Sequence, residues 1–186
     1  MRTAALHRYL FAALLFLGVF AVTETVDAGD PENTLYMDLE HGRVVIEMRP
    51  DLAPKHVARI KELVRQKFYD GLTFHRVIAG FMAQGGDPDG NGTGGSGQNL
   101  PAEFSSEPHV RGIVSMARSS NPNSGDSQFF IVFKKSPWLD GQYTVWGRVT
   151  EGMKYVSMLK RGDPNSNGVV DDPDRIVTMR VAADVD

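Results

Sequence analysis

Glycine interrupts this chain at short intervals, and the segments between the glycines are rich in valine, isoleucine, phenylalanine and tyrosine. With 19 glycines in 186 residues, few segments are long enough to form a helix. Short β-branched and aromatic segments bounded by turn residues are typical of strands. The sequence therefore predicts a mainly β fold. The expected strands are residues 35–39, 43–48, 73–77, 81–84, 113–116, 129–133, 145–149 and 177–182.

The first two of these strands are predicted to form a hairpin. Glu40, His41 and Gly42 separate them, and Gly42 can supply the positive φ that a tight turn requires.

Two segments, residues 54–68 and 151–161, have helical rather than alternating periodicity. Pro54 suits a first helical turn, and Gly162 suits a helix stop. Many short strands with two separated helices favour a closed antiparallel barrel whose ends the helices cover. The inward-facing positions are Val57, Ile60, Val64 and Phe68 in the first segment and Met153, Val156 and Leu159 in the second.

The first 28 residues are predicted to be a signal peptide. Arg2 and Arg8 flank the start of an apolar run at residues 9–22, and the small residues around Ala28 suit cleavage. The run is shorter than the roughly 20 residues of a membrane-spanning helix, which favours cleavage near Ala28 over a permanent anchor. An uncleaved membrane tether is the alternative. We expect the mature protein to be periplasmic or secreted.

The rest of the chain has the size of one domain, which we divide into a short linker at residues 29–34 and a folded domain at residues 35–186. It has no cysteine, which excludes disulfides, thiol catalysis and cysteine metal sites and suits an oxidising compartment. The net charge is −3 and no basic stripe is present, so nucleic acid is not expected as a partner. We expect a monomer that meets a membrane only if the signal peptide is retained.

Residues 85–101 form a long irregular stretch, in which residues 90–95 match the glycine spacing of a phosphate-binding loop. Such a loop must open a helix whose amides meet the anion. No helical pattern follows here. We therefore interpret the stretch as tight turns on the barrel surface.

The usual catalytic constellations are missing from the sequence. The histidines lack zinc-ligand spacing, no Gly-x-Ser-x-Gly elbow is present, and Ser119, Ser120 and Ser124 have no evident base. We expect His75 to be a buried imidazole bonded to the backbone rather than a catalytic group.

Residues 74–87, FHRVIAGFMAQGGD, set one permanent cation beside apolar side chains and an uncharged amide, with no nucleophile. Rotation about a prolyl peptide bond needs neither proton transfer nor a covalent intermediate. Twisting the amide localises the nitrogen lone pair, so a donor at that nitrogen binds the twisted form better than the planar one. Arg76 is the obvious donor, because its guanidinium cannot lose its proton. Phe81, Met82, Phe130 and Leu139 can form an apolar wall for the ring, and Gln84 and Gln128 can hold the substrate backbone.

This motif and SQFFI at residues 127–131 together resemble the cyclophilin family of peptidyl-prolyl cis-trans isomerases. The resemblance covers about residues 33–184, and the chain is similar to bacterial exported, periplasmic members. It implies a closed eight-stranded antiparallel β-barrel capped by two α-helices. It also implies X-Pro isomerisation without a cofactor, acting on proline-containing segments of exported proteins as they fold.

The resemblance also assigns residue roles. Arg76, Phe81 and Gln84 are implied to be catalytic, with Arg76 as the donor. After Ala117, where many members carry asparagine, this chain has Arg118, and Tyr143 stands where many have histidine. The position of Trp138 is one that the family links to cyclosporin, so we expect some inhibition by that drug. The implied substrate-binding residues are Met82, Ala117, Gln128, Phe130, Trp138, Leu139 and Tyr143.

Residues 163–174 fit the spacing of an EF-hand calcium loop, with aspartate in place of the final glutamate. The next segment reads as a strand and Pro173 disturbs the exit, so a surface turn is the better interpretation. The calcium alternative would use Asp163, Asn165, Asn167 and Asp174.

Two functions from different classes remain open at this stage. The first is a prolyl isomerase that assists the folding of exported proteins. The second is a chaperone-like module that binds proline-containing segments without turnover.

Overall fold

The computed structural model describes residues 29–185, so the predicted signal peptide lies outside the described residues. In the part described, no helix is long and apolar enough to span a bilayer. The strands are β1 (Thr34–Leu39), β2 (Gly42–Met48), β3 (Arg76–Ile78), β4 (Met82–Gly85), β5 (Ile113–Met116), β6 (Phe129–Val132), β7 (Val145–Glu151) and β8 (Ile176–Val181), and the α-helices are α1 (Pro54–Arg65) and α2 (Met153–Val156).

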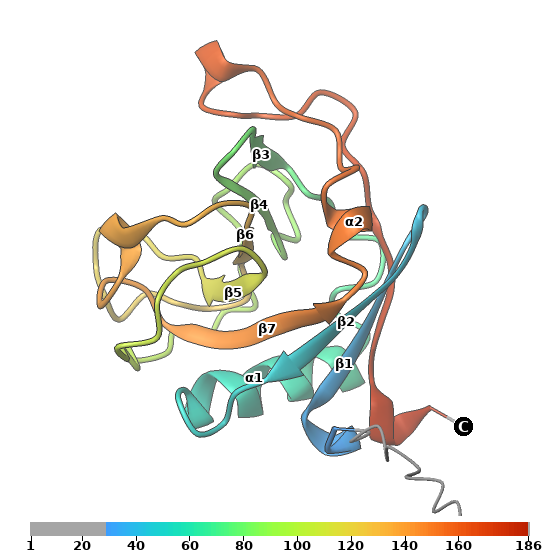
Figure 1. Cartoon of the computed structure of the whole chain (residues 1–186), viewed down its shortest axis with the longest axis vertical. Coiled ribbons are helices and arrows are strands. Elements are labelled where there is room, and N and C mark those ends of the chain that lie inside the picture. The colour runs from blue at the N-terminus through green and yellow to red at the C-terminus, as the bar shows by residue number, and fades with distance from the viewer. Residues whose placement is uncertain (1–28, 186) are drawn as a thin grey trace, which may run out of the picture.

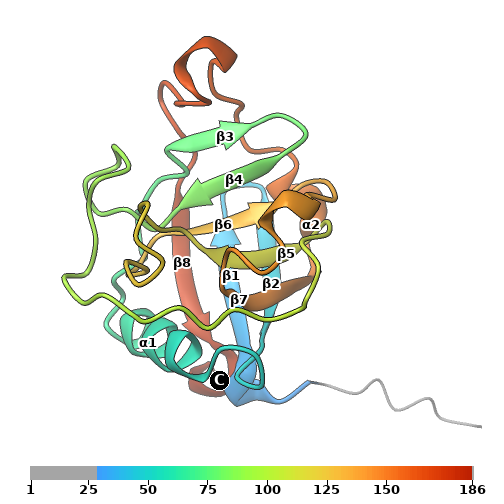
Figure 2. The same cartoon turned by 90° about the vertical axis from the view of Figure 1, so that its left-hand side faces the viewer.

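The eight strands form one antiparallel sheet in the order β3-β4-β6-β5-β7-β2-β1-β8, which curls into a barrel (Figures 1 and 2). The gap between β8 and β3 is closed by irregular backbone: Gly71 donates to the Ile176 carbonyl at 2.7 Å, and Phe74 donates to the Asp174 carbonyl at 2.9 Å. The predicted mainly β fold with eight antiparallel strands and two helices is therefore confirmed.

The predicted first hairpin is also confirmed. Leu39 pairs with Gly42 across a two-residue turn, and Gly42 has a φ of +140°. A Cβ at Gly42 would lie 2.6 Å from the ring of Tyr155, so the glycine also lets α2 pack against this turn.

Helix α1 packs its apolar side against the barrel through Val57, Ile60 and Val64, as the periodicity predicted. It ends at Arg65 rather than at Phe68. Lys67 adopts a φ of +58°, and the amides of Lys67 and Phe68 donate to the carbonyls of Val64 and Leu63, each at 2.9 Å. These two bonds form a Schellman motif, which terminates the helix although lysine stands where glycine is usual.

Helix α2 is much shorter than the predicted segment at residues 151–161. Glu151 still pairs with Val45 in the sheet, and Gly152 then breaks the strand with a φ of +79°. At the other end, the amides of Met158 and Leu159 donate to the carbonyls of Tyr155 and Val156 at 3.0 and 3.4 Å, so the chain continues in tighter turns rather than as an α-helix. Strand pairing before Gly152 and these turns after Ser157 therefore confine α2 to one turn.

The two faces of the sheet support two separate apolar clusters. Alternate residues such as Ala83, Phe129 and Ile131 point into the main core inside the barrel. Their neighbours Met82 and Phe130 lie in a second cluster on the outer face. The outer cluster is completed by Ile113, Val132, Leu139 and Val145, with Leu52, Ile78, Phe81, Ala117 and Tyr143 partly buried against it.

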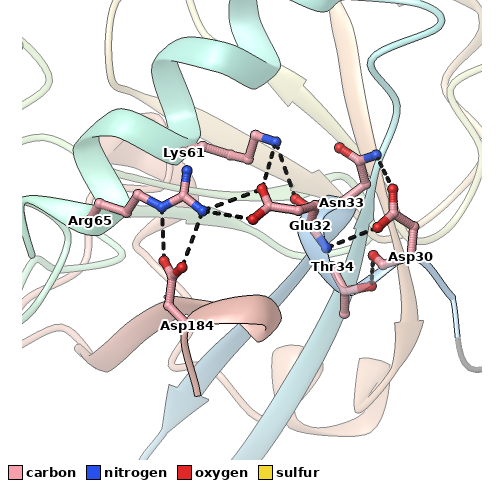
Figure 3. A network of polar contacts seen from close by, with 7 residues as sticks. All are labelled: Asp30, Glu32, Asn33, Thr34, Lys61, Arg65 and Asp184. Carbon is pink, nitrogen blue, oxygen red and sulfur yellow. Dashed lines mark hydrogen bonds and ion pairs between the residues drawn. The ribbon is translucent and has the colours of Figure 1, made fainter. Parts of the chain in front are cut away.

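Residues 29–34, predicted as a linker, contain a short 3-10 turn at Pro31–Asn33 and the first residue of β1. Figure 3 shows how this turn is tied to α1 and to the C-terminal end: Glu32 accepts from Lys61 at 3.3 Å and from Arg65 at 3.1 Å. Arg65 in turn donates to Asp184 at 2.8 Å. These exposed ion pairs join the two ends of the described chain at one corner of the molecule.

The segment between α2 and β8 rises beside β3 at one end of the barrel (Figures 1 and 2). It runs antiparallel to the free edge of β3, because Val77 donates to the Gly168 carbonyl at 2.8 Å and Val170 donates to the His75 carbonyl at 3.0 Å. This pairing brings residues 163–174, which we interpreted as a surface turn, against Arg76, the cation singled out from the sequence.

Candidate active site

One row of cross-strand partners forms the centre of the site. Arg76 of β3 pairs with Gln84 of β4, Gln84 pairs with Phe130 of β6, and Phe130 pairs with Ser115 of β5. Cross-strand partners in a sheet point to the same face. Residues from four strands, far apart in sequence, are therefore aligned on the outer face of the barrel.

A cavity of about 160 Å³ lies over this row. Met82, Phe130 and Leu139 form its buried apolar wall, at 2%, 5% and 5% exposure. An apolar cavity of about 150 Å³ can hold one benzene ring, so this one has room for a single small ring. Its lining residues are Arg76, Phe81, Met82, Gln84, Ala117, Arg118, Phe130, Leu139 and Tyr143.

Arg76 is held at the edge of the cavity by three hydrogen bonds to neutral acceptors. Its Nη1 donates to Gln84 Oε1 at 3.0 Å, its Nε donates to the Asn167 carbonyl at 2.9 Å, and its Nη2 donates to Asn167 Oδ1 at 2.9 Å. Within residues 29–185 it forms no ion pair with a carboxylate. Partial burial lowers the pKa of the guanidinium, which nevertheless stays charged at neutral pH. Two of its five N–H groups are left for a bound molecule.

Gln84 belongs to a chain of amides that fixes its orientation. Its Nε2 donates to Gln128 Oε1 at 2.9 Å, and Gln128 Nε2 donates to the Gly94 carbonyl at 2.9 Å. The carbonyl oxygen of Gln84 therefore faces Arg76. Our prediction that both glutamines hold substrate backbone stays a prediction; what the structure shows is that they orient the cation.

The glycine-rich stretch lines a second, larger cavity of about 370 Å³ next to the first. Two acids hold this stretch in place by accepting backbone amides. Asp87 accepts from Asp89, Asn91 and Gly92, and although burial alone would raise its pKa, these bonds lower it. Asp126 accepts from Ser96, Gly97 and Gln98. The next element after this stretch is strand β5, so no helix opens from it, which agrees with the rejection of a phosphate-binding loop.

Two of the ten predicted site residues do not line the smaller cavity. Gln128 lines the larger one. Trp138 is 64% exposed, and its ring lies 5.7 Å from that of Phe81 at the rim. Tyr143 meets Phe130 edge to face at 5.4 Å. The structure thus gathers the predicted residues around two adjoining cavities, while their individual roles stay predictions.

A Ser-His-Asp chain behind the pocket, buried at Ser115 and His109, was not found from the sequence. Ser115 Oγ lies 2.9 Å from His109 Nε2, and His109 Nδ1 lies 3.0 Å from Asp140 Oδ1. Ser115 is completely buried, so no substrate carbonyl can reach its hydroxyl. The imidazole instead stacks on Phe130, with ring centres 6.3 Å apart, and supports the pocket wall from behind. Sequence spacing gave no signal, because His109 lies in a loop.

Asn167 belongs to residues 163–174, which we interpret as a surface turn with calcium binding as the alternative. Its side chain contacts Arg76, while Asp163 accepts from the Asn165 amide and Asp174 from the Lys160 amide. In residues 29–185 no three acidic or histidine side chains are grouped to hold a metal. Asn167 is better described as a positioning residue for the guanidinium.

The remaining buried histidines take no part in this site. His75 is buried as predicted, but the predicted bond to the backbone is absent: neither ring nitrogen has a hydrogen-bond partner in the described chain. Burial lowers its pKa, as it does for His56 and His109.

Fold and site together define a class of protein: a β-barrel whose outer face carries a small pocket with an apolar wall and a fixed cation at its edge. The residues that line this smaller pocket, all of them described, include no serine, threonine, histidine or acid. Such a pocket suits non-covalent chemistry on an apolar ring beside an amide. The model of the cyclophilin type peptidyl-prolyl cis-trans isomerase family matches residues 34–181. The chain belongs to this family, and its enzyme class is peptidyl-prolyl cis-trans isomerase.

Named relatives agree with this assignment. A probable peptidyl-prolyl cis-trans isomerase of Brucella suis is 54% identical over 93% of this chain and 94% of its own length. The peptidyl-prolyl cis-trans isomerase B of Bacillus subtilis is 45% identical over 70% of this chain and 92% of its own.

Solved structures share the fold. The cyclophilin AquaCyp293 from Hirschia baltica superposes with a TM-score of 0.75 at 31% identity, covering 84% of this chain and 76% of its own. A Cryptosporidium parvum cyclophilin crystallised in the presence of the dipeptide Ala-Pro superposes with a TM-score of 0.72 at 29% identity, covering 80% of this chain and 98% of its own.

Proposed function

We propose that this isomerase accelerates rotation about X-Pro bonds by donating a hydrogen bond from Arg76 to the prolyl nitrogen as the amide twists. The observation that supports this most directly is a guanidinium fixed by three neutral acceptors beside a cavity of one-ring size that has an apolar wall. A carboxylate partner would neutralise the cation, whereas amide acceptors orient it and leave its charge available.

The chemistry follows from the electronic barrier. A planar peptide resists rotation by about 18–20 kcal/mol because the nitrogen lone pair is shared with the carbonyl. As the bond twists, the lone pair returns to nitrogen and becomes an acceptor. A charged hydrogen bond there is stronger in the transition state than in the planar ground state, which is the condition for catalysis.

The pocket wall contributes through position and polarity. Met82, Phe130 and Leu139 can hold the proline ring while the rest of the amide turns. Exclusion of water from this wall also strengthens the hydrogen bond from Arg76. No proton is transferred and no covalent bond forms, so neither a base nor a cofactor is required.

We also propose that the substrates are proline-containing segments of proteins that fold after export. The binding part of this proposal is supported by the Ala-Pro dipeptide named for the Cryptosporidium parvum relative. Export rests on the signal-like pattern of residues 1–28, with cleavage near Ala28. Mass spectrometry of the mature N-terminus tests it: a chain that still begins at Met1 would contradict cleavage.

Cyclosporin is a proposed inhibitor, through the exposed ring of Trp138 at the rim of the smaller cavity. A Trp138→Ala variant should then need several times more drug for half inhibition. Equal sensitivity of the variant and the wild type would remove Trp138 from this role.

The test of function is a protease-free kinetic assay on a short X-Pro peptide. Wild type should accelerate exchange, and Arg76→Ala should reduce kcat/KM about 10- to 150-fold, the factor for a charged hydrogen bond of about 1.5–3 kcal/mol. Arg148→Ala is the matched control, because Arg148 is exposed on β7 and lines neither cavity. If wild type bound the peptide without accelerating exchange, the chaperone-like module would be the better function. If Arg76→Ala were as fast as wild type, the role of Arg76 would be wrong.

A further inference from the structure

Arg118 stands on the wall that the two cavities share. It lines both of them, together with Gln84 and Ala117. Its Nε and Nη2 donate to the Gln142 carbonyl at 3.1 and 2.9 Å, and its Nη1 donates to the Ser119 carbonyl at 2.9 Å. The guanidinium also lies over the ring of Tyr143, 4.6 Å from its centre. The side chain is therefore fixed between the two cavities.

The charge of Arg118 is not compensated locally. In the described part of the chain it makes no ion pair with a carboxylate. Among the residues that line the larger cavity, all of them described, Asp126 is the one acid. Its oxygens are already occupied by the amides of residues 96–98 and the Ser96 hydroxyl. With Arg76 at the edge of the smaller cavity, the adjoining cavities carry two cations against one occupied carboxylate.

A polypeptide whose proline occupies the smaller cavity has to pass this wall to reach the larger one. An extended chain advances about 3.3–3.6 Å per residue, so side chains within the next few residues pass the guanidinium. Three of the five N–H groups of Arg118 donate to carbonyls, and the other two have no acceptor within residues 29–185. A carboxylate is the group that matches a partly buried, fork-shaped cation best.

We propose that Arg118 is a specificity-determining residue, which makes the enzyme favour segments with aspartate or glutamate within three residues of the proline. This proposal rests on the function proposed above, in which the smaller cavity holds the proline ring. It names a substrate class, acidic X-Pro segments, that the pocket wall alone does not select.

A purely structural role for Arg118 makes a different prediction. In that role its fork to the Gln142 carbonyl would only tie two loops together across the mouth of the pocket. Loss of that tie would affect acidic, neutral and basic peptides alike. An effect of the Arg118 charge instead changes the order in which the peptides rank by kcat/KM, and this effect weakens as salt screens the charge.

The experiment uses the mature protein and peptides that carry glutamate, glutamine or lysine at each of the three positions before and after one proline. For each enzyme variant we measure the ratio of kcat/KM for the glutamate peptide to that for the lysine peptide, by protease-free exchange at low and high salt. At one or more positions the wild-type ratio should reach about 3–10 at low salt and fall toward 1 at high salt. Arg118→Gln should bring the ratio close to 1, and Arg118→Glu should invert it.

Two further variants keep the test decisive. Arg118→Lys keeps the charge and loses the fork, so it should retain the wild-type order, and a ratio near 1 would favour the structural role. Arg148→Gln removes an exposed cation outside the cavities and should leave the ratio unchanged. If the wild-type ratio is near 1 at every position, the proposal for Arg118 is wrong. Acceleration of the glutamine peptide in the same experiment would still support the isomerase function. Absence of acceleration for all peptides would instead contradict the proposed function.

Discussion

Replacement of Asn167 by glycine should slow the isomerase without unfolding it. Asn167 has a φ of +54°, a left-handed conformation that glycine adopts freely. The variant therefore keeps the backbone carbonyl that accepts from Arg76 Nε and removes only the Oδ1 acceptor of Nη2. Alanine would add backbone strain at this position and confuse the result.

The expected size follows from the bond that is lost. Because the lost bond is exposed to solvent, it contributes about 0.5–1.5 kcal/mol rather than the larger value of a buried charged bond. Weaker positioning of the guanidinium should therefore reduce kcat/KM about 2- to 12-fold. The two remaining hydrogen bonds that Arg76 donates, to the Asn167 carbonyl and to Gln84 Oε1, should keep the activity above that of Arg76→Ala. The free energy of unfolding should change by less than about 1 kcal/mol, because the loop is exposed.

The assay is protease-free exchange of one X-Pro peptide, with urea unfolding in parallel. Asn165→Ala is the matched control, since Asn165 is exposed in the same loop and its side chain makes no hydrogen bond within residues 29–185. A folded Asn167→Gly variant with wild-type kcat/KM would refute the positioning role. An equal loss in Asn165→Ala would show that loop order, rather than the amide of Asn167, supports Arg76.

Three other outcomes follow from the packing and the buried histidines. Phe130→Ala should lower the free energy of unfolding by about 3–5 kcal/mol and raise KM, which urea unfolding and kinetics at 15 °C can check; an unchanged KM would contradict its place in the pocket wall. Gly42→Ala should destabilise by about 1–3 kcal/mol, because its Cβ would lie 2.6 Å from a tyrosine ring, and an unchanged melting temperature would speak against that contact. Burial holds the folded-state pKa of three histidines below the ordinary value of 6.5. Below that pH the unfolded state therefore binds more protons than the folded state. The free energy of unfolding should fall as the pH drops from about 7 to about 5. Urea midpoints across this range test the sign, and a higher midpoint at the acidic end would be inconsistent with neutral buried imidazoles at His56, His75 and His109.

Strand identity could be predicted from the sequence because it depends on local features. Every predicted strand is present, and α1 starts at the proline that marks its first turn. The ends of the helices were less predictable. Lys67 ends α1 in a conformation that usually requires glycine, and Glu151 stays in β7 because Val45 pairs with it. Neither the left-handed conformation of Lys67 nor the pairing of Glu151 with Val45 can be identified from local periodicity.

Which residues line the candidate site could be predicted from the sequence, but which residues hold them in place could not. The motif around Arg76 indicated a cation beside an apolar wall, and eight of the ten named residues do line one cavity. The support of Arg76 by Asn167 depends on a loop that is about 90 residues away and pairs with the edge of β3. The chain from Ser115 through His109 to Asp140 likewise forms only when three loops and strands meet. Long-range contacts of this kind leave no periodic signal.

The central claim is that Arg76 stabilises the twisted amide rather than the bound peptide. Nuclear magnetic resonance exchange on one X-Pro peptide, at concentrations up to saturation, gives both the Kd and the rate of cis-trans interconversion in the bound state. For Arg76→Ala, we predict a bound-state rate about 10- to 150-fold below wild type with a Kd within about threefold of wild type. A variant that bound the peptide far more weakly but interconverted it at the wild-type rate would contradict the claim, because Arg76 would then serve binding alone.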